Sequence, residues 1–542
     1  MISLGLGLAM AALAQGGEQP AAIAFTDVTA ASGLNMQTVS GDVPSTQIPE
    51  AKGGGLALID FDADGDLDVF VPNGATLAAP EHGPGARLWE NLGGLKWRDV
   101  TAASGIDHHR WSFGAAVGDY DADGLEDIYV CCLGPDVLWR NIGGGKFTDA
   151  TAAAGLPQDT QWDSSAAFAD LDLDGDLDLV VIGYLKFDPG ALPAPSRFKD
   201  IAVMAGPRGM TAEPDRLYEN LGNGVFADRS VESGLRAAAL ADERFGLNLA
   251  VADLTLDGKP DIFIANDSQA DQLFEGQGGL RFNETGRRRG VATNIEGTEQ
   301  ASMGIALGDV DLSGSPDLLV GVFSSDTNTL HLNRAGQRFD DRSSQYGVAA
   351  PSRTLCGWAA ALADLDNDRD EDLLVFNGHV YPQATMATMD SDYAQRPLLM
   401  ERDGPRFRAV SGGEWATAHR DRSAVFADLD HDGDIDVIVA EQNGPLRVLR
   451  NDHDNSTDSV VVALPGRGGQ GALVELEQDG LVQRRWFWGG GPFQSNTPQE
   501  AHFGVKPGET CQLRLHWRDG ETEQRSVLPG QRLVIRRLKA AG

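Results

Sequence analysis

The feature that most constrains this chain is a nine-residue acidic segment that occurs seven times. The first copy, residues 60–68, reads Asp-Phe-Asp-Ala-Asp-Gly-Asp-Leu-Asp, with aspartates at positions 1, 3, 5, 7 and 9 and glycine at position 6. Alternate carboxylates on a tight turn converge on one point, where a hard cation takes about six to eight oxygen ligands. Without a cation, these like charges would repel one another and raise one another's pKa.

The remaining copies are residues 119–127, 170–178, 253–261, 309–317, 364–372 and 428–436. One such segment alone is as compatible with a solvated acidic turn as with a Ca²⁺ loop, but seven copies at one spacing favour the Ca²⁺ loop. An EF-hand closes with Glu at position 12 and lies between helices. Here position 9 instead leads into apolar, β-branched runs, which are typical of strands. The sequence therefore predicts calcium-binding β-hairpins that hold up to seven Ca²⁺ ions.

The predicted ligands are the side chains at positions 1, 3, 5 and 9 and the backbone carbonyl of position 7. In chain order, the candidate metal-binding residues are Asp60, Asp62, Asp64, Asp66, Asp68, Asp119, Asp121, Asp123, Leu125, Asp127, Asp170, Asp172, Asp174, Asp176, Asp178, Asp253, Thr255, Asp257, Asp261, Asp309, Asp311, Ser313, Ser315, Asp317, Asp364, Asp366, Asp368, Asp370, Asp372, Asp428, Asp430, Asp432, Asp434 and Asp436. Thr255 at position 3 and Ser313 at position 5 offer a hydroxyl, so their loops are expected to bind more weakly. Arg369 occupies position 6, where the other loops have glycine; a positive φ there is one that arginine tolerates poorly.

The loops belong to a repeat of roughly 50 to 60 residues, which indicates a repeat architecture. In the first unit, apolar runs flank the loop, a third run follows at residues 87–90, and an aromatic-x-Asp strand ends the unit at residues 97–100. Four short strands per unit are typical of a propeller blade. A final-strand motif, Phe25-Thr26-Asp27, precedes the first loop, and none follows the last loop. We therefore predict an all-β, seven-bladed propeller over residues 25–451, closed by its N-terminal strand.

The two ends of the chain predict further segments. Residues 452–458 form a polar linker, and the strand-like runs after it predict a small antiparallel β domain over residues 459–537. Residues 1–14 are apolar and end in Ala12-Leu13-Ala14, which predicts a signal peptide that is too short to span a bilayer. Ca²⁺ loops also work best outside the cytosol. We therefore expect a secreted or periplasmic protein without a membrane span.

Charge and cysteine content exclude other classes. The net charge is −36, and 32 of the 80 acidic residues fall within the seven loops. Such a surface repels nucleic acids and anionic membranes. Four cysteines in 542 residues do not form a disulfide framework.

The motifs resemble those of a known family. Phe113-Gly114-Ala115, Phe245-Gly246 and Met303-Gly304 are similar to the "FG" positions of FG-GAP/VCBS repeats. Residues 471–472, 502–504 and 515–520 resemble the ASPIC/UnbV domain, and residues 377–382 resemble a motif of the same family. The chain thus resembles cartilage acidic protein-like proteins over about residues 25–537. The resemblance implies an integrin-α-like, calcium-binding propeller of seven blades, but no settled activity.

No catalytic motif accompanies this resemblance. The sequence contains no HExxH, G-x-S-x-G or phosphate-binding glycine loop. Trp486-Phe487-Trp488 is interpreted as packing, with a sugar platform as the alternative. The leading hypothesis is a binding or adhesion-type module for a protein, a glycan or a small anionic ligand. The alternative is an enzyme of natural-product or carbohydrate chemistry that holds its substrate in a calcium-structured channel.

Topology suggests where a ligand would bind. In a four-stranded blade, the acidic loops lie on one face of the disc, whereas the insertions at residues 184–214 and 382–395 fall on the other. Blade-to-blade loops are expected to gather arginines at the channel mouth, beside Trp162. The candidate ligand-binding residues are Arg110, Trp111, Arg244, Arg353, His379, Tyr381 and Arg420. The alternative is that each arginine pairs locally, for example with Asp242 or Asp421.

Overall fold

The computed structural model describes residues 23–236, 244–453, 458–466, 468–496 and 498–537. In this part of the chain, the repeats form seven antiparallel sheets of four strands each, one of which gains a fifth strand. The predicted signal peptide lies outside the described residues.

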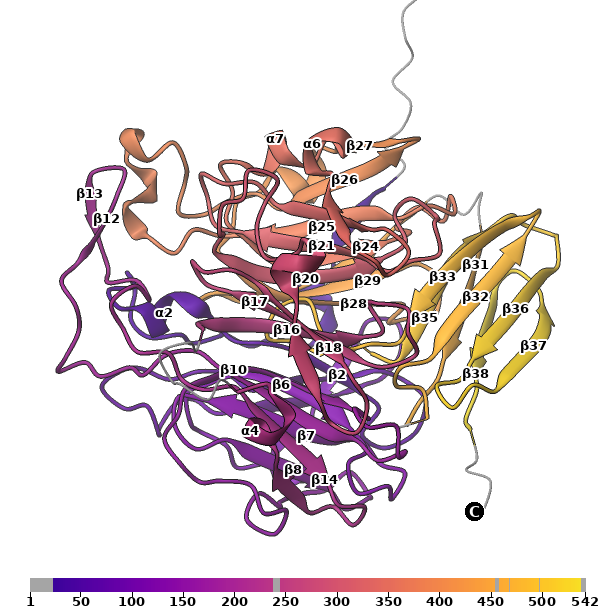
Figure 1. Ribbon diagram of the computed structural model, residues 1–542, viewed down its shortest axis with the longest axis horizontal. Coiled ribbons are helices and arrows are strands. Elements are labelled where there is room, and N and C mark those ends of the chain that lie inside the picture. Colours follow the sequence, from indigo (N-terminus) through magenta and orange to yellow (C-terminus); the bar gives the residue numbers. More distant parts are fainter. Residues whose placement is uncertain (1–22, 237–243, 454–457, 467, 497, 538–542) are drawn as a thin grey trace, which may run out of the picture.

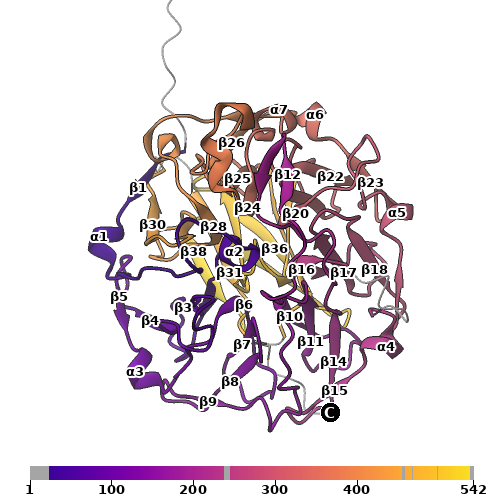
Figure 2. The same ribbon diagram turned by 90° about the vertical axis from the view of Figure 1, so that its left-hand side faces the viewer.

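The sheets follow one another in chain order around a common centre, which is a β-propeller-like arrangement (Figure 2). The first three sheets are β2–β5 (Ala57–Ile59, Asp68–Val71, Arg87–Asn91, Trp97–Asp99), β6–β9 (Ser112–Gly118, Asp127–Cys132, Val137–Asn141, Phe147–Asp149) and β10, β11, β14 and β15 (Asp163–Ala169, Asp178–Gly183, Arg216–Asn220, Phe226–Asp228). The next two are β16–β19 (Gly246–Ala252, Asp261–Asn266, Gln272–Gly276, Phe282–Glu284) and β20–β23 (Ser302–Gly308, Asp317–Val322, Thr329–Asn333, Phe339–Asp341). The last two are β24–β27 (Gly357–Ala363, Asp372–Asn377, Leu398–Asp403, Arg406–Ala409) and β28–β30 with β1 (Asp421–Ala427, Asp436–Glu441, Leu446–Asn451, Phe25–Asp27).

Each acidic loop joins the first two strands of its sheet. In the first sheet, Ile59 pairs with Asp68, so the ninth loop residue opens the second strand. The first strands from β6 onward are buried almost along their whole length, which requires apolar or small residues on both faces. At Gly304 of β20, an added Cβ would lie 1.6 Å from the carbonyl oxygen of Trp358 in β24. This "FG" glycine therefore permits the close approach of neighbouring sheets.

The N-terminal strand lies at the edge of the last sheet. β1 pairs antiparallel with β30, and Phe25 lies opposite Asn451. The Phe25 ring also contacts Trp415 edge-on at 5.1 Å. The first and last strands of the repeat region thus share one sheet.

Short helices connect the sheets. Five of them are single turns that follow an outer strand and end at a left-handed glycine: α1 (Thr29–Ser32), α3 (Thr101–Ser104), α4 (Ser230–Ser233), α5 (Gly286–Arg289) and α6 (Ser343–Tyr346). The others are α2 (Ile48–Lys52), α7 (Ala349–Ser352) and the 3₁₀ turns η2 (Pro382–Thr385), η3 (Ala387–Met389) and η4 (Gly413–Ala416). No helix in the described ranges is long and apolar enough to cross a membrane.

Two further sheets come from the C-terminal part of the chain, which we call the C-terminal region. One contains β31 (Asp458–Ala463), β35 (Glu500–Val505) and β38 (Gln531–Val534), and the other contains β32 (Leu473–Gln478), β33 (Leu481–Trp486), β36 (Cys511–His516) and β37 (Thr522–Val527). They lie against one face of the repeats, whereas α2 and the hairpin β12–β13 (Ser196–Phe198, Ile201–Val203) lie on the opposite face (Figure 1).

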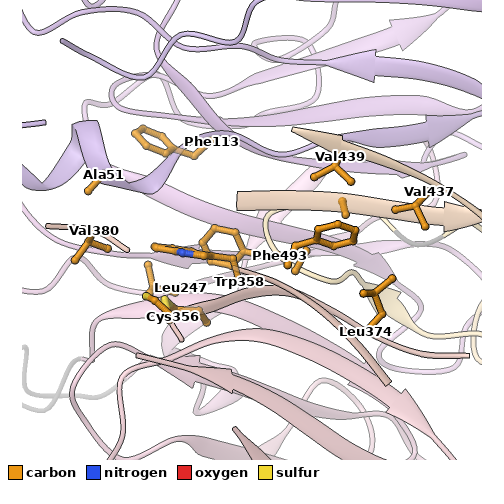
Figure 3. Packing of buried hydrophobic residues seen from close by; sticks show 14 of the residues in the cluster. Ala51, Phe113, Leu247, Cys356, Trp358, Leu374, Val380, Val437, Val439 and Phe493 are labelled. Atoms are coloured by element: carbon orange, nitrogen blue, oxygen red, sulfur yellow. The ribbon is translucent and has the colours of Figure 1, made fainter. Parts of the chain in front are cut away.

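A segment of the C-terminal region enters the common centre of the seven sheets, whose arrangement we call the ring. Its short strand β34 (Gly489–Gly490) pairs with β16 and supplies the fifth strand of that sheet. Further along, the carbonyl of Pro492 accepts a hydrogen bond from Ile305 N–H at 3.0 Å, and that of Gln494 accepts one from Ala115 N–H at 3.2 Å. Phe493 lies against Trp358 in the central hydrophobic cluster (Figure 3), with ring centroids 4.9 Å apart. The centre of the ring is therefore filled by the chain itself.

Candidate metal centres and the opposite face

The acidic loops bring three carboxylates together. Carboxylate oxygens from positions 1, 3 and 9 lie within 4.8 Å of one another in the loops at 60–68, 119–127, 170–178, 309–317 and 364–372. Position 5, which the sequence also predicted as a ligand, lies outside these groups. Asp64 and Asp174 instead accept hydrogen bonds from the N–H of Asp66 and Asp176, at 2.9 Å each. The position-5 carboxylate is thus bound to the backbone N–H of position 7 in its own loop.

The position-9 carboxylate anchors the loop to the sheet. Asp68 accepts hydrogen bonds from Phe61 N–H at 3.3 Å and from Asn91 N–H, on the third strand, at 2.7 Å. The same double contact recurs at Asp127, Asp178, Asp261, Asp317, Asp372 and Asp436. Position 9 therefore has a structural role in all seven loops, independent of any ion.

The backbone of the loop is left-handed at two positions. Position 6 has a φ between 83° and 99° in every loop, including 83° at Arg369. The prediction that this arginine occupies a glycine conformation is therefore confirmed. Position 4 is also left-handed, for example at Ala63 (62°) and His431 (61°), which sequence reasoning missed.

The electrostatics of the loops call for a positive partner. The pKa of Asp68 and Asp127 is raised to about 9, mainly by burial and to a smaller extent by neighbouring carboxylates. At the same time, Oδ1 of Asp60, Asp170 and Asp428, all at position 1, is buried without a hydrogen-bond partner. A buried acceptor without a partner costs about 1–3 kcal/mol, and more when it is charged. A cation would satisfy these oxygens and favour the ionised carboxylates.

The chemistry of the donors fits a hard cation. The groups offer only carboxylate oxygens, and the nearby turns add backbone carbonyls, which is the ligand type that Ca²⁺ prefers. The loops differ in their surroundings, however. Arg140 contacts Asp121 at 2.5 Å and Asp123 at 3.2 Å, and Arg334 contacts Asp311 at 3.1 Å. These arginines already neutralise part of the charge of the loops at 119–127 and 309–317.

The predicted arginine cluster is not supported by the contacts of its members. Arg110 lies 3.5 Å from Glu81 and donates to the carbonyl of Pro135 at 3.0 Å. Arg420 lies 3.4 Å from Glu441 and stacks over Tyr393. These two arginines therefore have separate partners, in agreement with the alternative of local pairing. The partner of Arg420 is Glu441, however, and not Asp421.

The other two arginines of the predicted cluster are Arg353 and Arg244. Arg353 ends α7, and its carbonyl accepts a hydrogen bond from Ser325 N–H. Arg244 directly precedes Phe245 and β16, and its suggested partner Asp242 lies outside the described residues. A role for Arg244 and Arg353 in ligand binding stays a prediction.

The predicted aromatic and histidine ligands lie mostly in the core. Trp111 and Trp162 are buried and pack against Phe113, and a role for Trp111 in ligand binding stays a prediction. His379 is fully buried, with its Nδ1 accepting from Tyr381 N–H and its Nε2 lying 2.7 Å from Ser324 Oγ. Burial lowers the pKa of His379 to about 3, so the ring is neutral. Its ring thus holds the backbone of Tyr381, and a role for His379 in ligand binding stays a prediction.

A buried ion pair, which sequence reasoning missed, joins α2 to the sheets on the face opposite the C-terminal region. Lys52 of α2 contacts Asp267 at 3.0 Å, and Tyr184 donates its hydroxyl to the same carboxylate at 2.6 Å. Burial alone would raise the pKa of Asp267, but Lys52 and the Tyr184 hydroxyl hold it below its usual value. The pair borders a cavity of about 90 Å³ that Phe323 and Tyr381 also line. No sequence motif marks Lys52 for this role, because the contact depends on where α2 packs.

Comparisons with known proteins agree with this architecture. A family model described as "FG-GAP-like repeat" matches residues 60–130, 123–181, 253–320 and 309–375, and one described as "ASPIC and UnbV" matches residues 465–541. Mouse (Mus musculus) cartilage acidic protein 1 is 26% identical over 332 residues, which are 58% of this chain and 48% of that protein. The chain thus spans about half the length of the curated relatives it matches. Human (Homo sapiens) integrin alpha-7 is 32% identical over 171 residues, or 28% of this chain and 13% of that protein.

One similar solved structure is that of YCF48 bound to a D1 peptide. It has a TM-score of 0.41 and 10% sequence identity, and covers 76% of this chain and 93% of that one. The family models and the curated relatives carry the assignment. The chain therefore carries FG-GAP-like repeats followed by an ASPIC and UnbV domain, and it is similar in sequence to cartilage acidic protein 1.

Proposed function

We propose that this protein is a calcium-binding propeller that acts as an extracellular or periplasmic binding module. The observation that carries the proposal is the recurring group of position-1, -3 and -9 carboxylates within 4.8 Å. Buried Oδ1 atoms without a partner at Asp60, Asp170 and Asp428 add independent support. In this proposal, Ca²⁺ holds each hairpin and so stabilises the ring.

The architecture we propose is a closed ring of seven blades over residues 25–451, followed by a β domain over residues 459–537. The pairing of β1 with β30 supports closure. Closure matters because an open blade would present an unpaired strand edge to other chains. Residues 1–14 are proposed to direct the chain out of the cytosol.

The ligand is proposed to bind on the face opposite the acidic loops. The C-terminal region covers the loop face, and its segment from Trp486 to Asn496 enters the common centre of the sheets. The opposite face carries the long insertions and the cavity beside Lys52, Phe323 and Tyr381. Loops on a rigid scaffold are a common place for binding residues. We propose a protein, glycan or small anionic ligand for this face.

Thermal unfolding in calcium, magnesium and chelator tests the calcium proposal. An ion that binds only the folded state stabilises it by about 2.7 kcal/mol per site at a hundredfold excess over Kd. Several occupied sites would together rival the roughly 5–15 kcal/mol of a typical domain. We expect a large drop in the unfolding midpoint with chelator and only partial recovery with magnesium. A midpoint indifferent to chelator would make these loops acidic turns.

A further inference from the structure

Cations of the C-terminal region face the first carboxylate of four acidic loops. Each contact joins an arginine Nη atom to Oδ2 of the position-1 aspartate. The four pairs are Arg518 with Asp170 at 3.5 Å, Arg484 with Asp309 at 3.8 Å, Arg532 with Asp428 at 3.9 Å and Arg536 with Asp60 at 4.0 Å. A fifth loop is contacted through the backbone, since Gly504 N–H donates to Asp364 Oδ2 at 3.0 Å.

The arginines come from separate places in the C-terminal region. Arg484 lies on β33, Arg532 on β38, and Arg518 and Arg536 just after β36 and β38. Strand β35 adds His502, whose Nε2 lies 2.8 Å from the carbonyl of Gly433 in the last loop. Besides the segment that pairs with β16, the region thus meets the acidic loops, with one contact type repeated at four of them.

The two oxygens of the same carboxylates have different surroundings. At Asp170, Oδ2 is held by Arg518 and by Gly175 N–H at 3.0 Å, whereas Oδ1 has no hydrogen-bond partner. Asp428 and Asp60 repeat this division: an arginine lies toward Oδ2, and Oδ1 is buried without a hydrogen-bond partner. Asp170 and Asp428 are only 8% and 4% exposed. In each of these carboxylates, Oδ2 therefore faces an arginine, and Oδ1 is available to bind a cation.

We propose that Arg518, Arg532 and Arg536 are positioning residues for the cation sites. Each orients a position-1 carboxylate from outside, so that its other oxygen faces the ion, and thereby fastens the C-terminal region to the occupied loops. The proposal rests on the proposed calcium binding and adds that the two parts of the chain share one set of carboxylates. Partners that orient metal ligands from outside are typically worth about 10–100-fold in metal affinity.

Calcium titration calorimetry on the full chain tests this inference. The variants are Arg536→Met, whose side chain is 49% exposed and whose loss leaves packing intact, and Arg518→Met. Arg525→Met is the matched control, because Arg525 belongs to the same region but pairs with Glu523 and faces no loop. We expect about tenfold weaker calcium binding at one site in each test variant, partial recovery in Arg518→Lys, and wild-type binding in Arg525→Met.

A double-mutant cycle assigns the effect to one loop. Asp170→Asn removes the affected carboxylate, so adding Arg518→Met to it should cause no further loss of calcium affinity. Unchanged or tighter binding in both Arg518→Met and Arg536→Met, with calcium uptake intact in the wild type, would overturn the positioning role and leave the proposed function standing. A wild-type chain that takes up no calcium would overturn both.

Discussion

Arg369 is the one residue at position 6 of the acidic loops whose type conflicts with its backbone. Its φ of 83° matches the values that glycine adopts at position 6 of the other loops. A left-handed conformation costs a residue with a Cβ about 1–2 kcal/mol. Because glycine also has more freedom in the unfolded chain, we expect Arg369→Gly to raise the free energy of unfolding by no more than about 1 kcal/mol. Arg369→Ala, which keeps the Cβ, serves as the control in urea unfolding and should bring no gain.

Positions 3 and 5 of a loop should respond differently to the loss of charge. Asp172 belongs to a carboxylate group with Asp170 and Asp178, whereas Asp174 caps Asp176 N–H. We expect Asp172→Asn to remove much of the roughly 2.7 kcal/mol that one ion contributes at a hundredfold excess over Kd. Asp174→Asn keeps its hydrogen-bond acceptor and should remove less. Equal losses in calcium-dependent unfolding would mean that both carboxylates bind the ion.

The spacing of the acidic residues predicted that the side chains at positions 1, 3 and 9 gather. It did not predict that position 5 lies outside the group, or which carboxylate oxygens lack a hydrogen-bond partner. Alternation alone places positions 1, 3, 5 and 9 on one side of the loop. The turn that binds Asp64 to Asp66 N–H depends on local backbone geometry, which spacing does not specify. Spacing does not specify the partners of the arginines either. Whether Arg110 meets Glu81 or a ligand depends on how two distant loops pack.

The first strand is the element that joins the two ends of the repeat region. β1 pairs with β30 through Phe25, Thr26 and Asp27. Starting the chain at Val28 should expose the edge of the last sheet, and we expect aggregation in light scattering because an unpaired edge recruits other chains. Starting it at Ile23 retains β1 and is the control. A chain that starts at Val28, stays monomeric and keeps its unfolding midpoint would contradict closure by β1.

The hairpins that carry the loops also predict a dependence on pH in chelator. Burial raises the pKa of Asp68, Asp127 and Asp317 to about 9 from an ordinary value of 3.8. A carboxyl group with a raised folded-state pKa stabilises the fold below its unfolded pKa and loses that contribution as pH rises through the folded value. The thermal unfolding midpoint without metal should therefore decrease as the pH rises from 7 to 9. Saturating calcium should reduce the fall, because the ion favours the ionised carboxylates; equal slopes with and without calcium would contradict this.

Elements were more predictable than their contacts. Each loop leads into a strand because apolar, β-branched residues follow position 9, and the extra Phe25-Thr26-Asp27 motif placed a strand at the N-terminus. The glycines at 489–491 gave the only sequence signal for the segment that enters the ring. Their small size allows the close approach, but which sheets they approach depends on how the C-terminal region docks on the loops.

In the whole molecule, we expect calcium in the acidic loops to organise the ring and, through it, the C-terminal region. Anomalous diffraction from crystals grown in calcium tests this most directly. We predict peaks between the position-1, -3 and -9 carboxylates, about 2.3–2.6 Å from their oxygens, with the strongest at Asp60, Asp170 and Asp428, whose Oδ1 atoms have no hydrogen-bond partner. Well-defined loop density with no anomalous peaks at saturating calcium would contradict calcium binding, with the sites filled instead by water or by the loops' own side chains.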